Sequence, residues 1–334
     1  MDKVHILLLF GGEEEKDIAA ISKDFILSNL KALKNEVENK ITITEILINN
    51  FKSLRELALH CASMLKEDNI YIIPCIHGRP GESGELQIEL EKLNLTYLGS
   101  DSDTSRKCFD KIQTKLAAKN LGVPVTPFLS LNLSTWQRDL KEVKNFFNLN
   151  QKNIFIKSAT QGSSIGCYQV TNEGDIEETI INSFKYGNKT LIEKTIMARE
   201  LEVAVFSLNE QLIISPPGEI LCEGIFYDFE KKYSKKSNIK TSTEATDLTA
   251  EEIKKIHSYT KVLTQGLNIK DLARIDFFKD INDGEIYLNE VNTFPGMTPI
   301  SMFPLLMKKT GVTFKQFLKS KIITEKMDTK DENN

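Results

Sequence analysis

Alternating apolar and amphipathic stretches fill the first hundred residues of the chain. Because the first apolar run, "VHILLLF" at 4–10, is apolar on both faces, it suits a strand of a parallel sheet. Two further runs, 41–48 and 70–78, also predict strands, and the stretches around 17–33 and 53–66 between them predict helices. This β-α-β-α-β order with short connections predicts a doubly wound parallel sheet, in which ligands bind beyond the carboxyl ends of the strands.

A different pattern, typical of α+β structure, begins near residue 105. The stretch 105–122 predicts a helix that ends at its terminal glycine, and short strands are predicted on either side of the loop "ATQGSSIG" at 159–166. Further on, "ARIDFFKD" (273–280) and "EIYLNEVN" (285–292) predict an antiparallel hairpin that turns at "DINDG". The polar stretch 233–249 predicts a mobile surface loop that could act as a lid, and the C-terminal tail is expected to be disordered.

Composition and charge exclude several classes of protein. The 334 residues are 40% hydrophobic and 27% charged, as in globular proteins of two or three domains. A formal net charge of −4 is too small to indicate a nucleic-acid or membrane partner. The five cysteines are scattered and form no C-x-x-C pair, which argues against disulfides and zinc and favours a reducing compartment. No apolar run approaches the length of a membrane span, so a cytoplasmic protein is expected.

The stretch "GEIYLNEVNTFPGMTPIS" changes from apolar to polar along one predicted strand. Side chains alternate along a strand, so one face is expected to carry Ile286, Leu288, Glu290 and Asn292. If the hairpin pairs as its turn suggests, Asp276 lies near Glu290, and two carboxylates about 4 Å apart repel by roughly 4 kcal/mol at a typical effective dielectric. A bound Mg²⁺ would relieve this repulsion and suits oxygen ligands. An exposed strand end with solvated charges is the alternative, and the pattern does not decide between them.

The glycine-serine loop is a candidate phosphate-binding element. It contains Gly162, Ser163 and Ser164 and follows the strand that carries Lys157. Such a loop can lay backbone N–H groups over phosphate oxygens, although the G-x-x-x-x-G-K-[ST] motif of a P-loop does not occur. Lys157 and Lys111 are candidate phosphate partners. An ordinary hairpin turn and solvated lysines are the alternative interpretation.

Four other polar residues stand at the ends of predicted strands. Glu193 and Glu200 are candidates to bind the base amine and ribose of a nucleotide, or they face water. Glu15 follows the first strand, where its carboxylate could receive a ligand ammonium, although acidic residues are also common in a first helical turn. His77 is a lone histidine at the end of the third strand.

Together, these motifs give the chain its resemblance to a known family. Over nearly its whole length it resembles the D-alanine–D-alanine ligases of the ATP-grasp superfamily, through "FGGEEEKDIAAIS", "HGRPGESGELQIELE", "GSDSDTSRKCFDKIQTK", "GVPVTP", "IKSATQGSSIG", "LIEKTIMARELEVAV", "FYDFEKKY", "ARIDFF" and "LNEVNTFPGMTPIS". The resemblance implies an ATP-grasp fold with an N-terminal α/β domain at 1–104, a central subdomain at 105–193, a C-terminal subdomain at 194–322 with an ω-loop lid at about 224–249, and a disordered tail at 323–334.

The resemblance implies ATP as cofactor with two Mg²⁺ ions, for which Mn²⁺ could substitute. The metal ligands would be Asp276, Glu290 and Asn292. The residues that would bind the phosphates, adenine and ribose are Lys111, Lys157, Ser164, Glu193, Lys194, Ile196, Glu200 and Lys232.

The resemblance also implies roles at the reacting groups. The catalytic residues would be Glu15, Ser163, Tyr233, Arg274 and Gly296. Glu15 would bind the ammonium of the first D-alanine and form a hydrogen-bonded triad with Ser163 and Tyr233, while Arg274 and the backbone of Gly296 would form an oxyanion hole. The substrate residues would be His77, Ser301 and Met302, the last two receiving the carboxylate of the second D-alanine.

The implied reaction is an ATP-dependent ligation that supplies peptidoglycan synthesis. ATP would convert one D-alanine to a D-alanyl phosphate, which the second D-alanine attacks as ADP and phosphate are released. A homodimer is a further family expectation. Departures from the family pattern leave two alternatives open, a ligase with another acceptor (D-serine, D-lactate or another amino acid) and a catalytically silent nucleotide-binding relative. These departures are Lys16, Ala19, Ser83, Ser158 and Met302. Tyr233 favours an amine acceptor, since D-lactate-using relatives carry histidine there.

Overall fold

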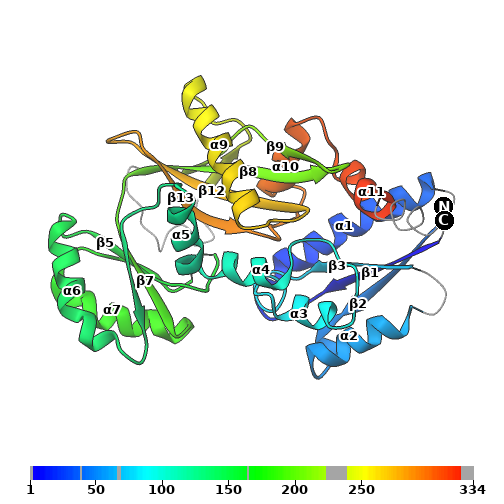
Figure 1. Cartoon of the computed structure of the whole chain (residues 1–334), viewed down its shortest axis with the longest axis horizontal. Coiled ribbons are helices and arrows are strands. Elements are labelled where there is room, and N and C mark those ends of the chain that lie inside the picture. The colour runs from blue at the N-terminus through cyan, green and yellow to red at the C-terminus, as the bar shows by residue number, and fades with distance from the viewer. Residues whose placement is uncertain (1–2, 38–39, 66–68, 164, 223–238, 325–334) are drawn as a thin grey trace.

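The computed structural model contains three β-sheets that lie side by side (Figure 1). It describes residues 3–37, 40–65, 69–163, 165–222 and 239–324. The N-terminal three-stranded sheet lies at one end, a four-stranded sheet at the other, and a six-stranded sheet between them. The predicted mixture of a parallel α/β unit with α+β units is therefore confirmed. Among the described residues, none of the helices has the length and apolar character needed to span a membrane.

The N-terminal sheet is parallel and has helices on both faces. Its strand order is β2-β1-β3. Leucines of β1 alternate between two cores, one shared with α1 and the other with α2 and α3, so the sheet is doubly wound as predicted. The elements are β1 (Val4–Phe10), α1 (Lys16–Glu36), β2 (Ile41–Leu47), a 3₁₀ turn (Ile48–Asn50), α2 (Leu54–Ser63), β3 (Asn69–Cys75) and α3 (Glu85–Glu91).

The four-stranded sheet is antiparallel, with the order β4-β7-β5-β6. Apolar side chains of α6 and α7 pack on one of its faces. The glycine-serine loop connects β5 to β6, as the sequence predicted. The elements are β4 (Phe128–Asn132), α6 (Trp136–Leu149), β5 (Ile154–Ser158), β6 (Cys167–Val170), α7 (Ile176–Ser183) with 3₁₀ turns before and after it (Glu173–Asp175 and Phe184–Tyr186), and β7 (Lys189–Lys194).

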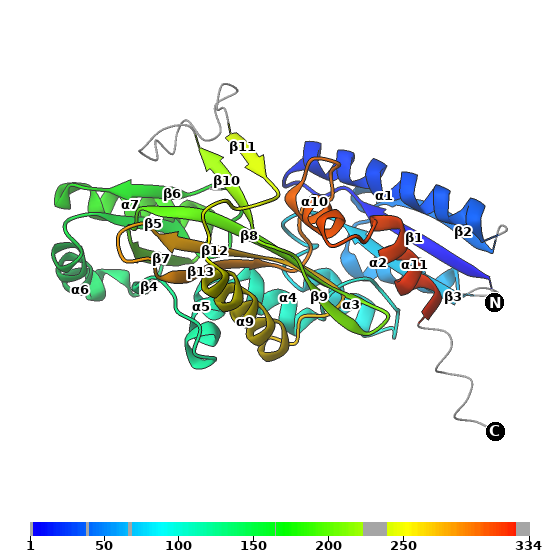
Figure 2. The same ribbon diagram turned by 90° about the horizontal axis from the view of Figure 1, so that it is seen from above.

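The six-stranded sheet lies between two helical layers, with the order β11-β10-β8-β12-β13 and with β9 paired to β8. One face packs on α9, and the other on α10 and α11. The last helix also contacts α1 (Figures 1 and 2). There the rings of Phe25 and Phe314 pack in a tilted arrangement, with their centroids 5.2 Å apart. The elements are β8 (Ala198–Leu208), β9 (Gln211–Ile214), β10 (Gly218–Cys222), β11 (Ile239–Ser242), α9 (Ala250–Gly266), β12 (Leu272–Asp280), β13 (Ile286–Asn292), α10 (Met302–Lys309) and α11 (Phe314–Thr324).

The single helix predicted over 105–122 is wrong, because the structure has two helices there. They are α4 (Ser102–Phe109) and α5 (Lys111–Asn120), and they meet at Asp110. The backbone of Asp110 is extended, and its side chain accepts hydrogen bonds from the N–H groups of Ile112 and Gln113. Aspartate favours such a capping position because its carboxylate satisfies N–H groups that have no partner within the helix. The break places Lys111 at the first position of α5.

The predicted lid and tail are each partly wrong. Residues 239–242 form β11, whose backbone pairs with β10 in an antiparallel ladder. An edge strand forms backbone hydrogen bonds with a neighbour on one side only, and both of its faces can carry polar side chains. The polar sequence of this segment therefore does not prevent it from pairing with β10. Residues 223–238, with most of the predicted ω-loop, lie outside the described residues, as do 325–334. The tail predicted over 323–334 is wrong for its first two residues, because α11 extends to Thr324.

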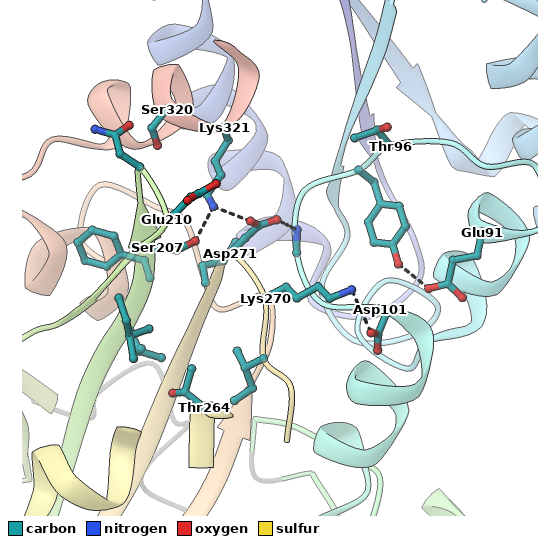
Figure 3. A pocket seen from close by; sticks show the side chains of 18 of the residues that line it. Glu91, Thr96, Asp101, Ser207, Glu210, Thr264, Lys270, Asp271, Ser320 and Lys321 are labelled. Atoms are coloured by element: carbon teal, nitrogen blue, oxygen red, sulfur yellow. Dashed lines mark hydrogen bonds and ion pairs between the residues drawn. The ribbon is translucent and has the colours of Figure 1, made fainter. Parts of the chain in front are cut away.

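A polar seam joins the N-terminal sheet to the six-stranded sheet along a cavity of about 620 Å³ (Figure 3). Asp271 is at its centre: it accepts a hydrogen bond from the N–H of Gly99 at 2.8 Å and lies 2.7 Å from Nζ of Lys321. Asp101 and Lys270 form a second ion pair at 3.3 Å. These charged side chains are already paired with one another. We therefore interpret them as structural contacts between the two domains and not as a ligand site.

Replacing Asp271 with alanine is expected to lower the free energy of unfolding by about 3 kcal/mol. The change leaves the Gly99 N–H without its acceptor and the largely buried Lys321 ammonium without its carboxylate, so that only the Ser207 hydroxyl still accepts from it. Urea unfolding measures the effect. Lys270→Ala is the control on the same seam; its side chain is 55% exposed, so a loss below about 1 kcal/mol is expected. Equal losses in the two variants would contradict the interpretation.

Candidate active site

A β-bulge in the hairpin of β12 and β13 determines which side chains reach the candidate site. Asp276 lies opposite Glu290, whereas the next residue of β12, Phe277, lies opposite Leu288. Asn289 is therefore an extra residue in β13. An extra residue shifts the alternation of side chains by one position for the rest of the strand.

The bulge contradicts the prediction that Ile286, Leu288, Glu290 and Asn292 share one face. The first two residues are buried in the core beside α9, and the next core residue is Val291. Glu290 and Asn292 are half-buried on the opposite face. The apolar face therefore stays apolar, and the acid and the amide belong to a separate, polar face.

On this polar face, an arginine and an amide hold one of the two facing carboxylates. Nε and Nη2 of Arg274 donate to the two oxygens of Asp276, each at 2.7 Å, and Nδ2 of Asn292 donates to Oδ2 at 3.0 Å. Glu290 Oε2 lies 2.9 Å from Nζ of Lys111. Burial raises the pKa of Glu290, but Lys111 outweighs it and, with other nearby cations, lowers the pKa to about 2. Asp276 thus lies beside Glu290 and Asn292, as the sequence analysis expected, although the bulge rather than the turn places Glu290 opposite it.

A third carboxylate continues the row on the neighbouring strand. Glu202 of β8 lies opposite Asp276, so Glu202, Asp276 and Glu290 form one line across β8, β12 and β13. Glu202 is buried, and its Oε2 lies 3.3 Å from Nε of Arg274. Burial raises the pKa of Glu202 to about 8, because Arg274 only partly offsets it and the neighbouring carboxylates add to it. The sequence analysis did not single out this residue.

Two buried lysines converge on Glu193 of β7. Lys157 Nζ lies 2.5 Å from one carboxylate oxygen and Lys115 Nζ 2.7 Å from the other, which also accepts the hydroxyl of Thr126. Burial raises the pKa of Glu193, but the two lysines outweigh it and hold the pKa below its usual range. Burial lowers the pKa of Lys115, whereas attraction to Glu193 outweighs burial at Lys157 and raises its pKa.

Lys115 is a site residue that the sequence analysis missed. Its side chain is 0% exposed, and its Nζ also donates to the carbonyl of Leu288 on β13 at 3.1 Å. One ammonium thus joins the four-stranded sheet to the six-stranded sheet. The signal was the spacing of "KIQTK", because residues four apart, such as Lys111 and Lys115, share one face of a helix.

The glycine-serine loop contacts the N-terminal domain through Ser163 and Glu15. The hydroxyl of Ser163 donates to Oε1 of Glu15, which precedes α1. Both residues have left-handed backbone, with φ of +46° and +45°. Such backbone costs about 1–2 kcal/mol in a residue with a side chain, so the contact holds two strained turns together. Ser164, Lys232 and Tyr233 lie outside the described residues, and their roles stay predictions.

His77 and the segment after β13 meet through one serine. Nε2 of His77 lies 3.1 Å from Oγ of Ser22, which accepts the N–H of Met297 at 3.2 Å. Next to Met297, a Cβ added at Gly296 would come within 3.0 Å of Oγ of Ser301. Glycine therefore lets the backbone approach this hydroxyl closely.

The predicted substrate residues at the start of α10 differ in what they offer. The Ser301 hydroxyl lies 2.7 Å from Oγ1 of Thr298 and accepts its N–H at 3.1 Å. Met302 has its side chain buried in the core shared with α1 and α11. Only the backbone N–H of Met302, in the first turn of a helix, is therefore suited to a substrate carboxylate.

A cavity of about 30 Å³ lies where the loop faces the hairpin. Its lining includes Lys111, Gly162, Glu290 and Asn292, and it is large enough to hold water. Within the described ranges, histidine, cysteine, aspartate and glutamate side chains nowhere gather in a group of three or more that could hold a metal ion. Phosphate oxygens and water would therefore have to complete the shell of a Mg²⁺ ion at Asp276 and Glu290.

The remaining predicted nucleotide residues lie on or next to β7 and β8. Lys194 ends β7, Ile196 lies in the connection, and Glu200 is on β8 opposite Phe278. Their roles toward adenine and ribose stay predictions.

Comparisons with known proteins agree with this architecture. Residues 117–324 match the family model described as D-ala D-ala ligase C-terminus. The chain is 42% identical to D-alanine--D-alanine ligase of Tolumonas auensis over 95% of this chain and 97% of that protein. Among solved structures, D-alanyl-alanine synthetase A from Vibrio cholerae superposes with a TM-score of 0.84 at 35% identity, covering 97% of this chain and 98% of that one. The VanG D-Ala:D-Ser ligase from Enterococcus faecalis has a TM-score of 0.81 at 25% identity, covering 96% and 99%.

The sheets, the polar hairpin and the glycine-serine loop define a ligase of the ATP-grasp class. Within that class, the chain belongs to the D-alanine–D-alanine ligase family.

Proposed function

We propose that this protein is an ATP-dependent D-alanine–D-alanine ligase that supplies the dipeptide for peptidoglycan synthesis. The observation that carries the proposal is the pairing of Asp276 with Glu290 at the end of the hairpin, beside Lys111 and facing the glycine-serine loop. A carboxylate pair flanked by ammonium groups is suited to Mg²⁺ and phosphate together, because each cation offsets charge that the other ligands bring.

The donor set at the hairpin fits Mg²⁺. Asp276, Glu290 and Asn292 offer oxygen ligands, which hard cations prefer. When bound, Mg²⁺ would supply positive charge that withdraws electron density from the transferring phosphoryl group. Two ions, and Mn²⁺ as a substitute, are part of the proposal.

The lysines of the site are placed to receive a triphosphate. Lys111 spans from the Gln161 carbonyl, at 2.9 Å, to Glu290, and Lys157 is held by Glu193. Phosphate oxygens that approach these ammonium groups would share them with the carboxylates. The glycine-serine loop, which follows Lys157 and contacts Lys111 through the Gln161 carbonyl, can add backbone N–H groups.

The D-alanine end of the site would lie between Glu15 and α10. Glu15 would hold the ammonium of the first D-alanine, so that its carboxylate is oriented toward the phosphoryl group. Arg274 would stabilise the oxyanion that forms when the second amine attacks the D-alanyl phosphate. The N–H groups at the start of α10, near Ser301, would orient the second carboxylate.

The test is to mix the purified protein with ATP, Mg²⁺ and D-alanine and to measure phosphate release and dipeptide mass. L-alanine, D-serine and D-lactate run in parallel, since VanG, a structural neighbour, is a D-Ala:D-Ser ligase. D-Ala-D-Ala as the main product is the expected result. Phosphate release only with another acceptor would contradict the substrate, and no turnover despite ATP binding would support the silent relative.

Replacing Ser163 with alanine is expected to lower kcat/KM for D-alanine about 10- to 100-fold. The change removes a hydroxyl–carboxylate hydrogen bond to Glu15, worth about 1.5–3 kcal/mol, that keeps the loop against the N-terminal domain. Steady-state kinetics at saturating ATP measure the effect, and thermal unfolding checks that the fold is retained. An unchanged kcat/KM would show that the hydrogen bond between Ser163 and Glu15 is not needed for the proposed reaction.

The cytoplasmic location and the homodimer stay predictions. Small-molecule substrates, ATP and D-alanine, are the partners that the proposed reaction requires. Sedimentation of the purified protein with and without nucleotide would test the dimer.

A further inference from the structure

Arg274 lies beside the carboxylates of Asp276 and Glu202, but it forms close hydrogen bonds only with Asp276. Its bidentate bonds to Asp276 are 2.7 Å long, whereas Glu202 Oε2 is 3.3 Å from Nε. In the described part of the chain, this Oε2 atom is buried and makes no hydrogen bond. A buried carboxylate oxygen without a hydrogen bond is unfavourable, so its retention at this place calls for a physical reason.

Asp276 cannot serve Arg274 and a metal ion equally well. Its Oδ2 already accepts from Arg274 and from Asn292, which leaves few lone pairs for a cation. A dication at Asp276 would also repel the guanidinium directly. Without another anion nearby, metal binding would therefore loosen Arg274, the group that the proposed reaction needs for its oxyanion.

We propose that Glu202 is a positioning residue that keeps Arg274 in the site when Asp276 binds a divalent cation. The row of Glu202, Asp276 and Glu290 places the third carboxylate on the side of Asp276 away from Glu290. Arg274 can transfer part of its hydrogen bonding from Asp276 to Glu202 with a small shift, because Nε is already within ion-pair distance of both. This inference rests on the proposed metal–nucleotide site.

Glu202 has a second effect on the same site. Its carboxyl group offers the guanidinium a second acceptor, which frees the oxygens of Asp276 for a divalent cation. A glutamine or a threonine at 202 is a weaker acceptor, so it is expected to weaken metal binding and to misplace Arg274. It is not expected to destabilise the fold, since Arg274 keeps its two bonds to Asp276.

The experiment measures Mn²⁺ binding in the presence of ADP by electron paramagnetic resonance. Glu202→Gln is expected to raise the Mn²⁺ dissociation constant at least tenfold and to lower kcat at saturating metal, with a melting temperature no lower than that of the parent. Glu202→Thr, uncharged and β-branched, is the second variant and is expected to behave alike. A role limited to the fold would instead lower the melting temperature and leave Mn²⁺ binding unchanged.

Glu219→Gln is the matched control. Glu219 is also buried and pairs with Arg199 through two 2.7 Å bonds, but it lies on β10 opposite Leu201, outside the row. This variant is expected to bind Mn²⁺ like the parent. Parent-like Mn²⁺ binding by a folded Glu202 variant would overturn the inference alone. Failure of the parent protein to bind Mn²⁺ with ADP would overturn the proposed metal site as well.

Discussion

Replacing Glu290 with alanine is expected to lower kcat at least about 10³-fold while the fold is retained. Glu290 supplies the carboxylate opposite Asp276, and in the proposed site a Mg²⁺ ion requires both. Loss of a metal that withdraws charge from the phosphoryl group costs several kcal/mol of transition-state stabilisation, and about 4 kcal/mol corresponds to 10³-fold. Dipeptide formation followed by mass spectrometry measures the effect.

The fold is expected to survive this change because Glu290 is half-buried and its partner keeps another contact. Lys111 retains the Gln161 carbonyl, so the free energy of unfolding should change by less than about 2 kcal/mol. Glu285→Ala is the control on the same hairpin; it removes an ion pair with Lys255 at the far end and should leave turnover unchanged. Full activity of the Glu290→Ala variant would contradict the assignment of Glu290 as a Mg²⁺ ligand.

The hairpin also shows how far the sequence can predict a site. Residue types and the turn were enough to predict that Asp276 comes near Glu290, because pairing in a tight hairpin follows from the turn. The register from the turn alone would place Asp276 opposite Asn289, and the bulge places Glu290 there instead. The bulge at Asn289 was missed although it breaks the alternation, because the two consecutive polar residues Asn289 and Glu290 were interpreted as a face that turns polar. It depends on how β13 packs against α9 on one side and on the polar row on the other.

Charged residues in the interior were the hardest part to predict. Glu202 and Lys115 look like ordinary surface charges in the sequence, because most glutamates and lysines are solvated. Their burial results from contacts between separate sheets, such as the bond from Lys115 to the Leu288 carbonyl. Local pattern carries no information about partners that are 173 residues away. By contrast, the parallel sheet was predictable because its apolar runs record burial on both faces.

Replacing Lys115 with alanine is expected to lower the free energy of unfolding by about 4 kcal/mol. The ammonium has three acceptors: Glu193 Oε1 at 2.7 Å, Thr126 Oγ1 at 3.2 Å and the Leu288 carbonyl at 3.1 Å. Removing one partner of a buried ion pair costs about 3–5 kcal/mol, and the lost side chain leaves a cavity in addition. Urea unfolding at pH 7 measures the effect.

The same change is expected to weaken ATP binding, because Glu193 would keep only Lys157 as its cation and would shift toward it. Calorimetry with ADP at a temperature where the variant is folded separates this effect from stability. Lys119→Ala, one turn further along α5 and exposed, is the control and should change stability by less than about 0.5 kcal/mol. Since Lys115 connects two sheets, a loss as small as that of the control would mean that its ammonium contributes little to holding them together.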